Sequence, residues 1–176
     1  MRYVRIVLLI ALGAGVFVVP ASVRVAAADG DAVQEAKDRA EIEALMWRYA
    51  RALDRFDADA YVAAYTPDGE FQAGGNPTKG TAALRKMIED LKTNRAEREK
   101  AGTPQAPMYH MEMNTYVEFI GKDRARHHSY WQTVFGAVGR GGQPRVAAAG
   151  HGVDDLVKVN GKWLIKVRNV SPGDSD

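Results

Sequence analysis

The order of helical and strand patterns along this chain of 176 residues predicts a single α+β domain, with N-terminal helices on one face of an antiparallel sheet. Two observations carry this prediction. In the first half, apolar residues recur every three or four positions, whereas the second half consists of long strand-like segments separated by glycine-rich turns. Apolar residues make up 46% of the chain and charged residues 26%, which is typical of a globular protein with one core.

The first 28 residues are expected to be a signal peptide, which leaves residues 29–176 as the domain. Arg2 and Arg5 precede an apolar run over residues 6–19, and the run ends before a small-residue segment that closes at Ala28. The run is shorter than the roughly 20 residues that cross a bilayer as a helix. We therefore expect cleavage after Ala28 and a periplasmic or secreted protein. An uncleaved leader stays open as an alternative, and it would be the chain's means of membrane attachment.

Charge and cysteine content exclude several classes of partner and site. Removal of residues 1–28 takes away three arginines and no acid, so the formal net charge changes from +2 to −1. A nearly neutral domain lacks the basic surface that nucleic-acid binding requires. The chain has no cysteine, which excludes disulfides, a thiol nucleophile and thiolate metal ligands.

The first half of the domain is expected to form three helices and one short strand. Apolar residues on one side predict a first helix over Ala32–Asp54. Asp57 is a suitable N-cap for a second helix over Ala58–Tyr65. Pro67–Gly69 then predicts a turn into a strand over Glu70–Ala73.

Thr81 is expected to cap a third helix. The segment Thr93–Pro107 is charged and then punctuated by glycine and proline, which favours a frayed helix end followed by a loop over a pocket mouth. The inward face of this helix is expected to comprise Leu84, Met87, Ile88 and Leu91.

The second half is expected to form four antiparallel strands. Tight turns are predicted at Gly121–Asp123 and at Asn160-Gly161, the latter being a strong hairpin signal. The expected strands are Met108–Ile120, Arg124–Val138, Arg145–Val159 and Lys162–Val170.

This order of elements and several short motifs resemble the SnoaL-like branch of the NTF2-like superfamily, which includes scytalone dehydratase and bile-acid dehydratase. The resemblance extends over nearly all of residues 36–170. Its motifs are Tyr49-x4-Asp54 with Asp57-Ala-Asp59 after it, Thr66-Pro-Asp-Gly, Lys79-Gly80, His110-x3-Asn114, Gly121-Lys-Asp123, and Asp154 to Trp163 with Arg168 beyond.

The resemblance implies a cone in which a strongly curved sheet wraps three helices and leaves an apolar cavity open at one end. Such a pocket is the default binding site for a small apolar molecule. Members of this branch include isomerases, dehydratases, cyclases, hydrolases and non-catalytic modules, so one fold serves many functions. The resemblance further implies no cofactor, and a homodimer that pairs through the exposed face of the sheet.

Asp54, His110 and Tyr49 are the candidate catalytic residues. By the resemblance, His110 matches a dehydratase histidine that acts as acid and base, and Asp54 faces the cavity where it holds that histidine. Tyr49 matches a tyrosine whose hydroxyl stabilises an enolate-like oxygen. From the residues alone, a solvated acid at a helix end, a structural histidine and a core tyrosine remain open.

Four further residues are expected to contact the substrate: Asn114, Tyr65, Tyr130 and Arg168. Asn114 shares a strand face with His110 if the pairing is regular. Arg168 binds an acidic group of the ligand or pairs with Asp154 or Asp155. We expect no metal, because the adjacent histidines His127 and His128 point to opposite faces of a strand.

The sequence thus favours an exported, cofactor-independent lyase or isomerase that acts on a small carbonyl-bearing ring compound. The alternative is a non-catalytic binding or assembly module of the same fold. A cavity filled by side chains such as Trp131 and Phe135, or a large separation of Asp54 from His110, would favour the alternative.

Overall fold

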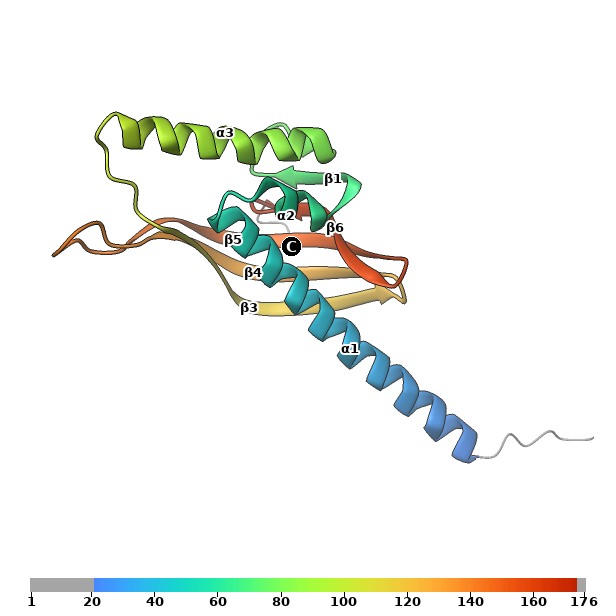
Figure 1. Ribbon diagram of the computed structural model, residues 1–176. Helices are drawn as coiled ribbons and strands as arrows, with labels where there is room; N and C mark the ends of the chain where they lie inside the picture. Colours follow the sequence, from blue (N-terminus) through green and yellow to red (C-terminus); the bar gives the residue numbers. More distant parts are fainter. Residues whose placement is uncertain (1–20, 174–176) are drawn as a thin grey trace, which may run out of the picture. The chain divides into compact units, whose positions relative to one another are not determined.

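The computed structural model describes residues 21–173, and only the backbone for residues 21–29. The chain divides into two units, residues 1–35 and residues 36–176, and the second contains every element apart from the start of α1. The elements, labelled in Figure 1, are α1 (Ala21–Asp54), α2 (Ala58–Ala63), β1 (Tyr65–Gln72), β2 (Thr78–Lys79), α3 (Thr81–Lys100), β3 (Met108–Gly121), β4 (Arg124–Phe135), β5 (Arg145–Val159) and β6 (Lys162–Asn169).

The expected signal peptide, residues 1–28, lies outside the described residues except at its end. Residues 21–28 are the helical start of α1, which therefore begins before the expected Ala32. Several alanines in this segment have the highest intrinsic helix propensity, which accounts for the longer helix. Among residues 21–173, no helix is both long enough and apolar enough to cross a membrane.

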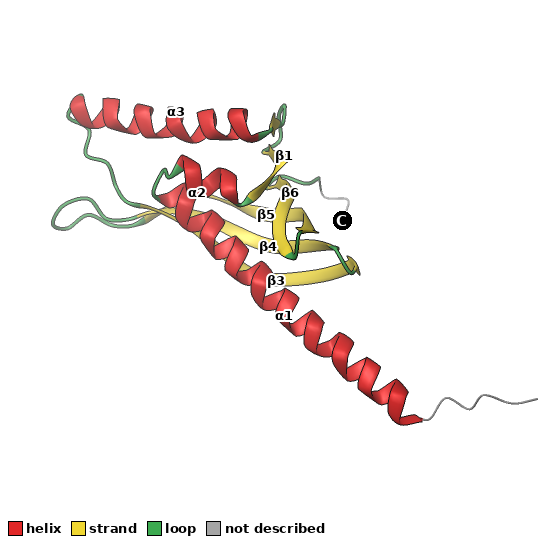
Figure 2. Ribbon diagram, turned by 45° about the vertical axis from the view of Figure 1, so that its right-hand side comes forward, coloured by secondary structure: helices red, strands yellow, loops and turns green. Residues whose placement is uncertain are grey.

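The sheet of the second unit has six strands in the order β2-β1-β6-β5-β4-β3. Only β1 and β6 pair in parallel, and all the other neighbours are antiparallel. Figure 1 shows β1 beside α3 and the central strands below α2, and Figure 2 shows the same arrangement from another side, so the sheet curls around α2. The predicted α+β fold, with helices packed in a curved and mostly antiparallel sheet, is confirmed.

The core lies between the helices and the concave face of the sheet. Each helix contributes from one face, because its apolar residues recur at helical spacing. The largest fully buried apolar side chains are Ile42 and Leu45 of α1, Tyr61 of α2, Leu84 and Ile88 of α3, Leu156 of β5, and Ile165 of β6.

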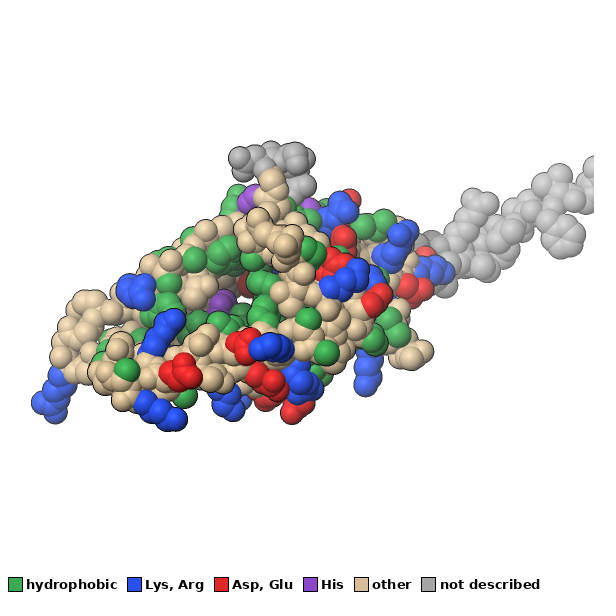
Figure 3. All heavy atoms as spheres, turned by 90° about the horizontal axis from the view of Figure 1, so that it is seen from above, with side chains coloured by type: hydrophobic (Ala, Val, Ile, Leu, Met, Phe, Trp, Pro, Cys, Tyr) green, Lys and Arg blue, Asp and Glu red, His purple; other side chains and the backbone are tan. Residues whose placement is uncertain are grey.

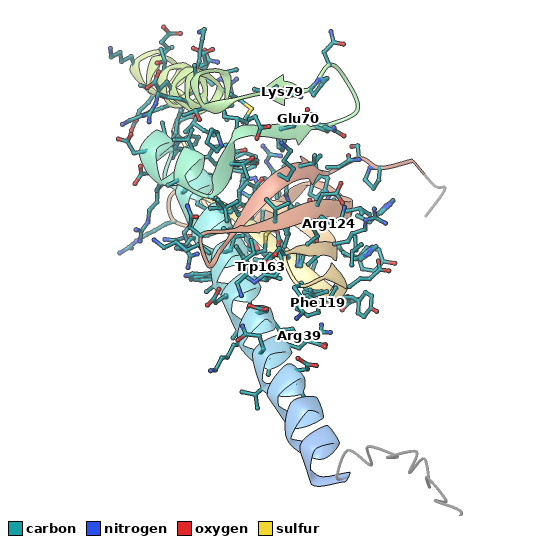
Figure 4. The ribbon with its side chains drawn as sticks, turned by 90° about the vertical axis from the view of Figure 1, so that its right-hand side faces the viewer. Arg39, Glu70, Lys79, Phe119, Arg124 and Trp163 are labelled. Carbon is teal, nitrogen blue, oxygen red and sulfur yellow. The ribbon has the colours of Figure 1, made fainter. Side chains whose placement is uncertain are left out.

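Two charged residues join α1 to the sheet. Asp38 is 5% exposed, accepts a hydrogen bond from Trp163 Nε1 at 3.0 Å, and pairs with Lys158. The guanidinium of Arg39 lies 4.9 Å from the ring centre of Phe119, and Arg39, Phe119 and Trp163 are near one another in Figure 4. These contacts fix the part of α1 that follows residue 35 against β3, β5 and β6.

The predicted turns between the last strands are confirmed, and the strand ends shift by a few residues. Asn160 and Gly161 both have positive φ, 50° and 77°, as a tight hairpin turn requires. β4 ends at Phe135 instead of the expected Val138, since Gly136 leaves the ladder and bonds to the backbone of Pro107 at 2.8 Å.

The predicted turn at Pro67–Gly69 is wrong, because these residues continue β1. The pairing of β1 with β6 shifts register between Tyr65 and Glu70, so an irregularity within the strand accommodates the proline and glycine. Gly69 then accepts a hydrogen bond from the Gly80 backbone at 2.8 Å. Glu70 and Lys79 pair across β1 and β2 at 2.5 Å, as labelled in Figure 4.

The helix caps follow the prediction at α2 only. Asp57 accepts a hydrogen bond from the Ala60 backbone at 3.0 Å and caps α2 as expected. The N-cap of α3 is Gly80, with φ of 83° and no side-chain cap, so the predicted Thr81 cap is wrong. The expected frayed end is also wrong, since α3 continues to Lys100. The second half of α3 is charged and largely solvated, and Leu91, at the start of this half, is 41% exposed rather than inward.

Candidate active site

A pocket of about 840 Å³ lies between α1 and β3. One wall is formed by α1 residues from Arg39 to Ala50, and the other by β3 residues from His110 to Val117, with His127 of β4 beside them. Most of its surface is apolar, and Trp47, which is 68% exposed, belongs to the α1 wall. A space-filling view from above shows a recess that is framed by hydrophobic side chains and holds a histidine (Figure 3).

Asp54 and His110 contact each other directly at the end of α1 and the start of β3. One carboxylate oxygen, Asp54 Oδ1, accepts the backbone N–H of His110 at 2.9 Å and also lies 2.9 Å from His110 Nδ1. A carboxylate can only accept a hydrogen bond, so it holds the proton on Nδ1 and leaves Nε2 with a free lone pair. The separation required for an acid/base pair is therefore met.

The carboxylate of Asp54 is fixed from its other side as well. Arg51, one turn earlier on α1, donates to Asp54 Oδ2 at 3.2 Å. The Asp54 side chain is 5% exposed and that of His110 is 21% exposed. A buried acid thus orients a histidine that reaches the pocket, an arrangement that can stabilise an imidazolium once the ring has accepted a proton.

Tyr49 is buried in a cluster of three tyrosines and is not among the residues that line the pocket. Its ring centre lies 5.4 Å from that of Tyr61 and 6.1 Å from that of Tyr65. The hydroxyls of Tyr61 and Tyr65 are 3.0 Å apart. Burial raises the pKa of Tyr49, and the charge of Arg168 partly opposes this rise. Tyr49 and Tyr65 were expected to contact a ligand, but both lie in the core and neither lines the pocket.

Arg168 is the centre of a buried network and is 3% exposed. One guanidinium nitrogen pairs with Asp154 Oδ2, and another donates to Glu112 Oε1 at 2.6 Å. Asp154 also accepts from His127 Nδ1 at 3.2 Å. The sequence left two partners open for Arg168, a ligand or an acid of the domain. In the structure Arg168 pairs with acids of the domain.

The electrostatics of this network follow from its burial. Burial alone would lower the pKa of Arg168, but Asp154, then Tyr49 and Glu112, raise it well above its usual value. Burial raises the pKa of Glu112, an effect that Arg168 opposes and Asp154 reinforces. Among the side chains of residues 30–173, three buried polar atoms have no hydrogen-bond partner: Glu112 Oε2, Arg168 Nε and Ser129 Oγ.

Asn114 does not share a face with His110, and that expectation is wrong. The pairing of β3 with β4 shifts register between Met113 and Tyr116, and Asn114 has a positive φ of 50° at this irregularity. Asn114 instead lines a second hollow of about 370 Å³, together with the exposed Tyr130. The two predicted substrate contacts therefore lie apart from the Asp54–His110 pair.

Trp131 does not fill the larger pocket. Its indole N–H donates to the backbone oxygens of His151 and Val170, at 3.0 and 3.1 Å. The ring lies over Gly150, where an added Cβ would come within 2.9 Å of it. This glycine makes room for the indole against the sheet, and neither Trp131 nor Phe135 is among the pocket residues.

Comparison with known protein families identifies the domain. A model of the SnoaL-like domain matches residues 34–169. The chain belongs to the SnoaL-like family. A search among curated proteins finds no match.

Solved structures with this fold resemble the SnoaL-like domain over most of its length. An NTF2-like protein with a cystatin-like fold from Novosphingobium aromaticivorans is 22% identical, with a TM-score of 0.66 over 83% of this chain and 90% of that one. A candidate scytalone dehydratase from the same organism is 22% identical, with a TM-score of 0.62 over 78% and 85%. LinA is 17% identical, with a TM-score of 0.62 over 78% and 86%. At these identities the likeness concerns the fold.

Two pocket residues of this SnoaL-like domain were missed by the sequence analysis. Glu112 follows His110 by two positions, and alternate residues of a strand share a face, so this signal was present. His127 was weighed only as a metal ligand, yet its neighbour His128 points away and His127 is 3% exposed beside Asp154. Within residues 30–173, whose side chains the structure describes, no group of three or more His, Cys, Asp or Glu side chains is placed to hold a metal ion.

Proposed function

We propose that this SnoaL-like domain is an exported, cofactor-independent lyase or isomerase that acts on a small carbonyl-bearing ring compound. A dehydratase is the reaction type we favour. The observation that supports it most is the contact between Asp54 and His110, at 2.9 Å, beside a largely apolar pocket. Likeness of fold to a candidate scytalone dehydratase gives further support.

In this proposal His110 is the base. Its Nε2 removes a proton from the carbon next to the carbonyl group, and Asp54 stabilises the imidazolium that forms. General-base catalysis by a positioned histidine contributes roughly 10²–10⁴-fold to a rate. The apolar pocket wall suits a ring compound, and a pocket of about 840 Å³ is within the range that small-molecule sites occupy.

Tyr49 has a supporting role in this proposal. The guanidinium of Arg168 lies 5.0 Å from the centre of its ring, and the two side chains hold each other in the core. Tyr49 also packs on Tyr61, so it fixes the part of α1 that leads to Asp54.

The test uses His110→Ala with His151→Ala as the matched control. His151 is on β5 and lines the second hollow, and it is not among the residues of the larger pocket. A panel of cyclic β-hydroxy ketones is incubated with each protein, and loss of water is followed by mass spectrometry. We expect elimination by the wild type and by His151→Ala, and a loss of at least about 100-fold in His110→Ala. Equal elimination by all three proteins would refute the proposal.

A binding protein without turnover is the alternative, and the exposed Trp47 on the pocket wall favours it, because aromatic side chains are common at ligand sites. In that case the same ketones change the fluorescence of Trp47, a Trp47→Phe variant loses the change, and no ketone is converted. Export is checked separately, by the mass of the protein recovered outside the cytoplasm. This mass should correspond to a chain that begins at Asp29.

A further inference from the structure

Glu112 is the polar neighbour of His110 on the pocket wall. The two residues are separated by one position on β3, which places them on the same face about 7 Å apart along the strand. Both line the larger pocket, and the Glu112 side chain is 11% exposed. The pocket surface beside His110 therefore includes Glu112.

The two carboxyl oxygens of Glu112 differ in their surroundings. Oε1 accepts from Arg168 Nη2 at 2.6 Å, whereas Oε2 is buried and has no hydrogen-bond partner. A buried carboxylate oxygen without a partner is costly, because its desolvation is not compensated. A proton on Oε2 removes that cost, and it converts this oxygen into a hydrogen-bond donor.

The charges around Glu112 also call for a proton. The guanidinium of Arg168 lies between two acids, Glu112 and Asp154, and one positive charge cannot neutralise both. Ionisation of both acids would also place two negative charges close together in a buried site, so, in addition to burial, the charge of Asp154 helps to raise the pKa of Glu112. The groups that act on Glu112 are Arg168 of β6, Asp154 of β5 and His127 of β4, and burial raises its pKa against the opposing charge of Arg168.

We propose that Glu112 is the acid of the pocket: it holds a proton on Oε2 in the resting protein and gives it to the oxygen that leaves the substrate. This inference rests on the proposed function. His110 Nε2 takes the proton next to the carbonyl, the electrons of that C–H bond form the new C=C bond, and the C–O bond of the β-hydroxyl breaks. The oxygen leaves as water with the proton of Glu112. Transfer of one proton from His110 back to Glu112 through solvent then restores both groups.

The proposal specifies the class of substrate. The oxygen that leaves must lie one carbon beyond the carbon that loses its proton, as in a β-hydroxy ketone. A neutral hydroxyl suits a protonated Glu112, whereas an acidic group at the same place would lie beside an acidic residue of the pocket wall. We therefore expect neutral hydroxy ketones to be preferred over hydroxy acids of the same size.

The first test needs no substrate. Glutamate labelled with an NMR-active isotope at its carboxyl carbon is incorporated, and the resonance that is lost in Glu112→Gln is followed during a pH titration. We expect this carboxyl to be protonated at a pH at which the resonance lost in Glu118→Gln, on an exposed residue of the same strand, reports an ionised group. A Glu112 that ionises together with Glu118 overturns the proposal.

The second test separates the acid from the base. Glu112→Gln keeps the shape and the hydrogen bond to Arg168 but has no proton to give. We expect its elimination of water from a cyclic β-hydroxy ketone to fall by about 100-fold or more relative to its exchange of the α-hydrogen in heavy water, with Glu118→Gln as the control. An equal effect on both steps would overturn the role of Glu112. Absence of exchange in the wild type would instead refute the proposed function, and the titration would still decide whether Glu112 holds a proton.

Discussion

One oxygen of Asp54 holds His110 by its backbone and by its ring at the same time. The backbone contact fixes the start of β3 against the end of α1, and the ring contact fixes which nitrogen is free. The geometry of the pair therefore depends on hydrogen-bond acceptance, whereas stabilisation of an imidazolium depends on the negative charge.

Asp54→Asn separates these two contributions. An amide oxygen can still accept both hydrogen bonds, so the fold should be retained, but the charge is lost and the ring can take the wrong tautomer. We expect elimination to fall on the order of 10⁴-fold, the effect that this change has in a Ser-His-Asp triad. The measurement is the rate of water loss, together with the circular dichroism of the variant.

The control for this variant is Asp59→Asn. Asp59 is an exposed acid that pairs with Arg85, at 2.7 Å, away from the pocket. Wild-type rates in Asp59→Asn and a large loss in Asp54→Asn are expected. If Asp54→Asn retained the full rate, the carboxylate would have a structural role only.

Glu112 makes the stability of the domain depend on pH. Burial raises its pKa above 4.5, the ordinary value, although Arg168 opposes the rise. The folded protein therefore keeps the proton to a higher pH than the unfolded chain does. The stabilisation that this proton provides is complete below 4.5 and is lost as the pH rises through the folded-state pKa.

We accordingly expect the wild type to lose stability relative to Glu112→Gln as the pH rises above 4.5. Urea unfolding of both proteins at a series of pH values measures this difference. A difference that stayed constant over the series would show that Glu112 ionises alike in the folded and unfolded chain.

At the residue scale, the sequence predicted contacts between side chains that lie at the ends of helices and strands. Asp54 ends α1 and His110 is near the start of β3, so their approach follows from the fold. The pair of Arg168 and Asp154 was one of the predicted alternatives. Glu112 joins this pair from a third strand, through the register of the sheet, which the sequence does not encode locally. The predicted position of Asn114 was wrong for the same reason, because nothing in the neighbouring sequence signals the irregular pairing of β3 with β4.

Among the elements, α3 differs most from its sequence pattern. Ile88 is fully buried, while Leu91, one turn later, is 41% exposed although both were expected to face inward. The helix continues past the domain core, so its apolar residues recur beyond the point where other elements cover them. Helical periodicity predicts a face, but it does not predict how far the neighbouring elements extend.

Alanine substitutions at these two positions test the difference. Ile88→Ala removes a buried side chain and should lower the free energy of unfolding by about 2–5 kcal/mol. Leu91→Ala should change it by less than about 1 kcal/mol, because the side chain is largely solvated already. Urea unfolding measures both, and similar losses would mean that Leu91 is covered in solution, for example by a partner.

β1 was the other element that the sequence predicted incorrectly. A Thr-Pro-Asp-Gly segment ordinarily predicts a turn, yet here it continues the strand beside β6. Tertiary pairing outweighs local preference in this case, because Tyr65 at its start and Gln72 at its end both align with β6. The strands of the second half, by contrast, were predicted to within a few residues, since their turns and alternation agree.

For the whole molecule, the convex face of the sheet carries exposed apolar residues. Met113 of β3 is paired with Tyr130 of β4, and the two are 36% and 58% exposed. Tyr109 and Val146 are also exposed on neighbouring strands. Apolar groups gathered on a surface in this way are typical of an interface, and we propose that two copies of the domain pair through this face.

A double variant, Met113→Glu with Tyr130→Glu, tests this pairing. Charges of like sign on both copies should separate a dimer into monomers, and light scattering measures the change in mass. The circular dichroism should stay unchanged, because neither side chain is in the core. A wild-type protein that is already monomeric at all concentrations would contradict the proposed pairing.

The central claim is that His110, held by Asp54, removes a proton next to a carbonyl group inside the pocket. The most direct measurement is the exchange of that hydrogen for deuterium in heavy water, using a cyclic ketone that lacks a hydroxyl and so cannot lose water. We predict that the wild type accelerates the exchange and that His110→Ala does not. Exchange at the same rate with the wild type and with His110→Ala would contradict the claim.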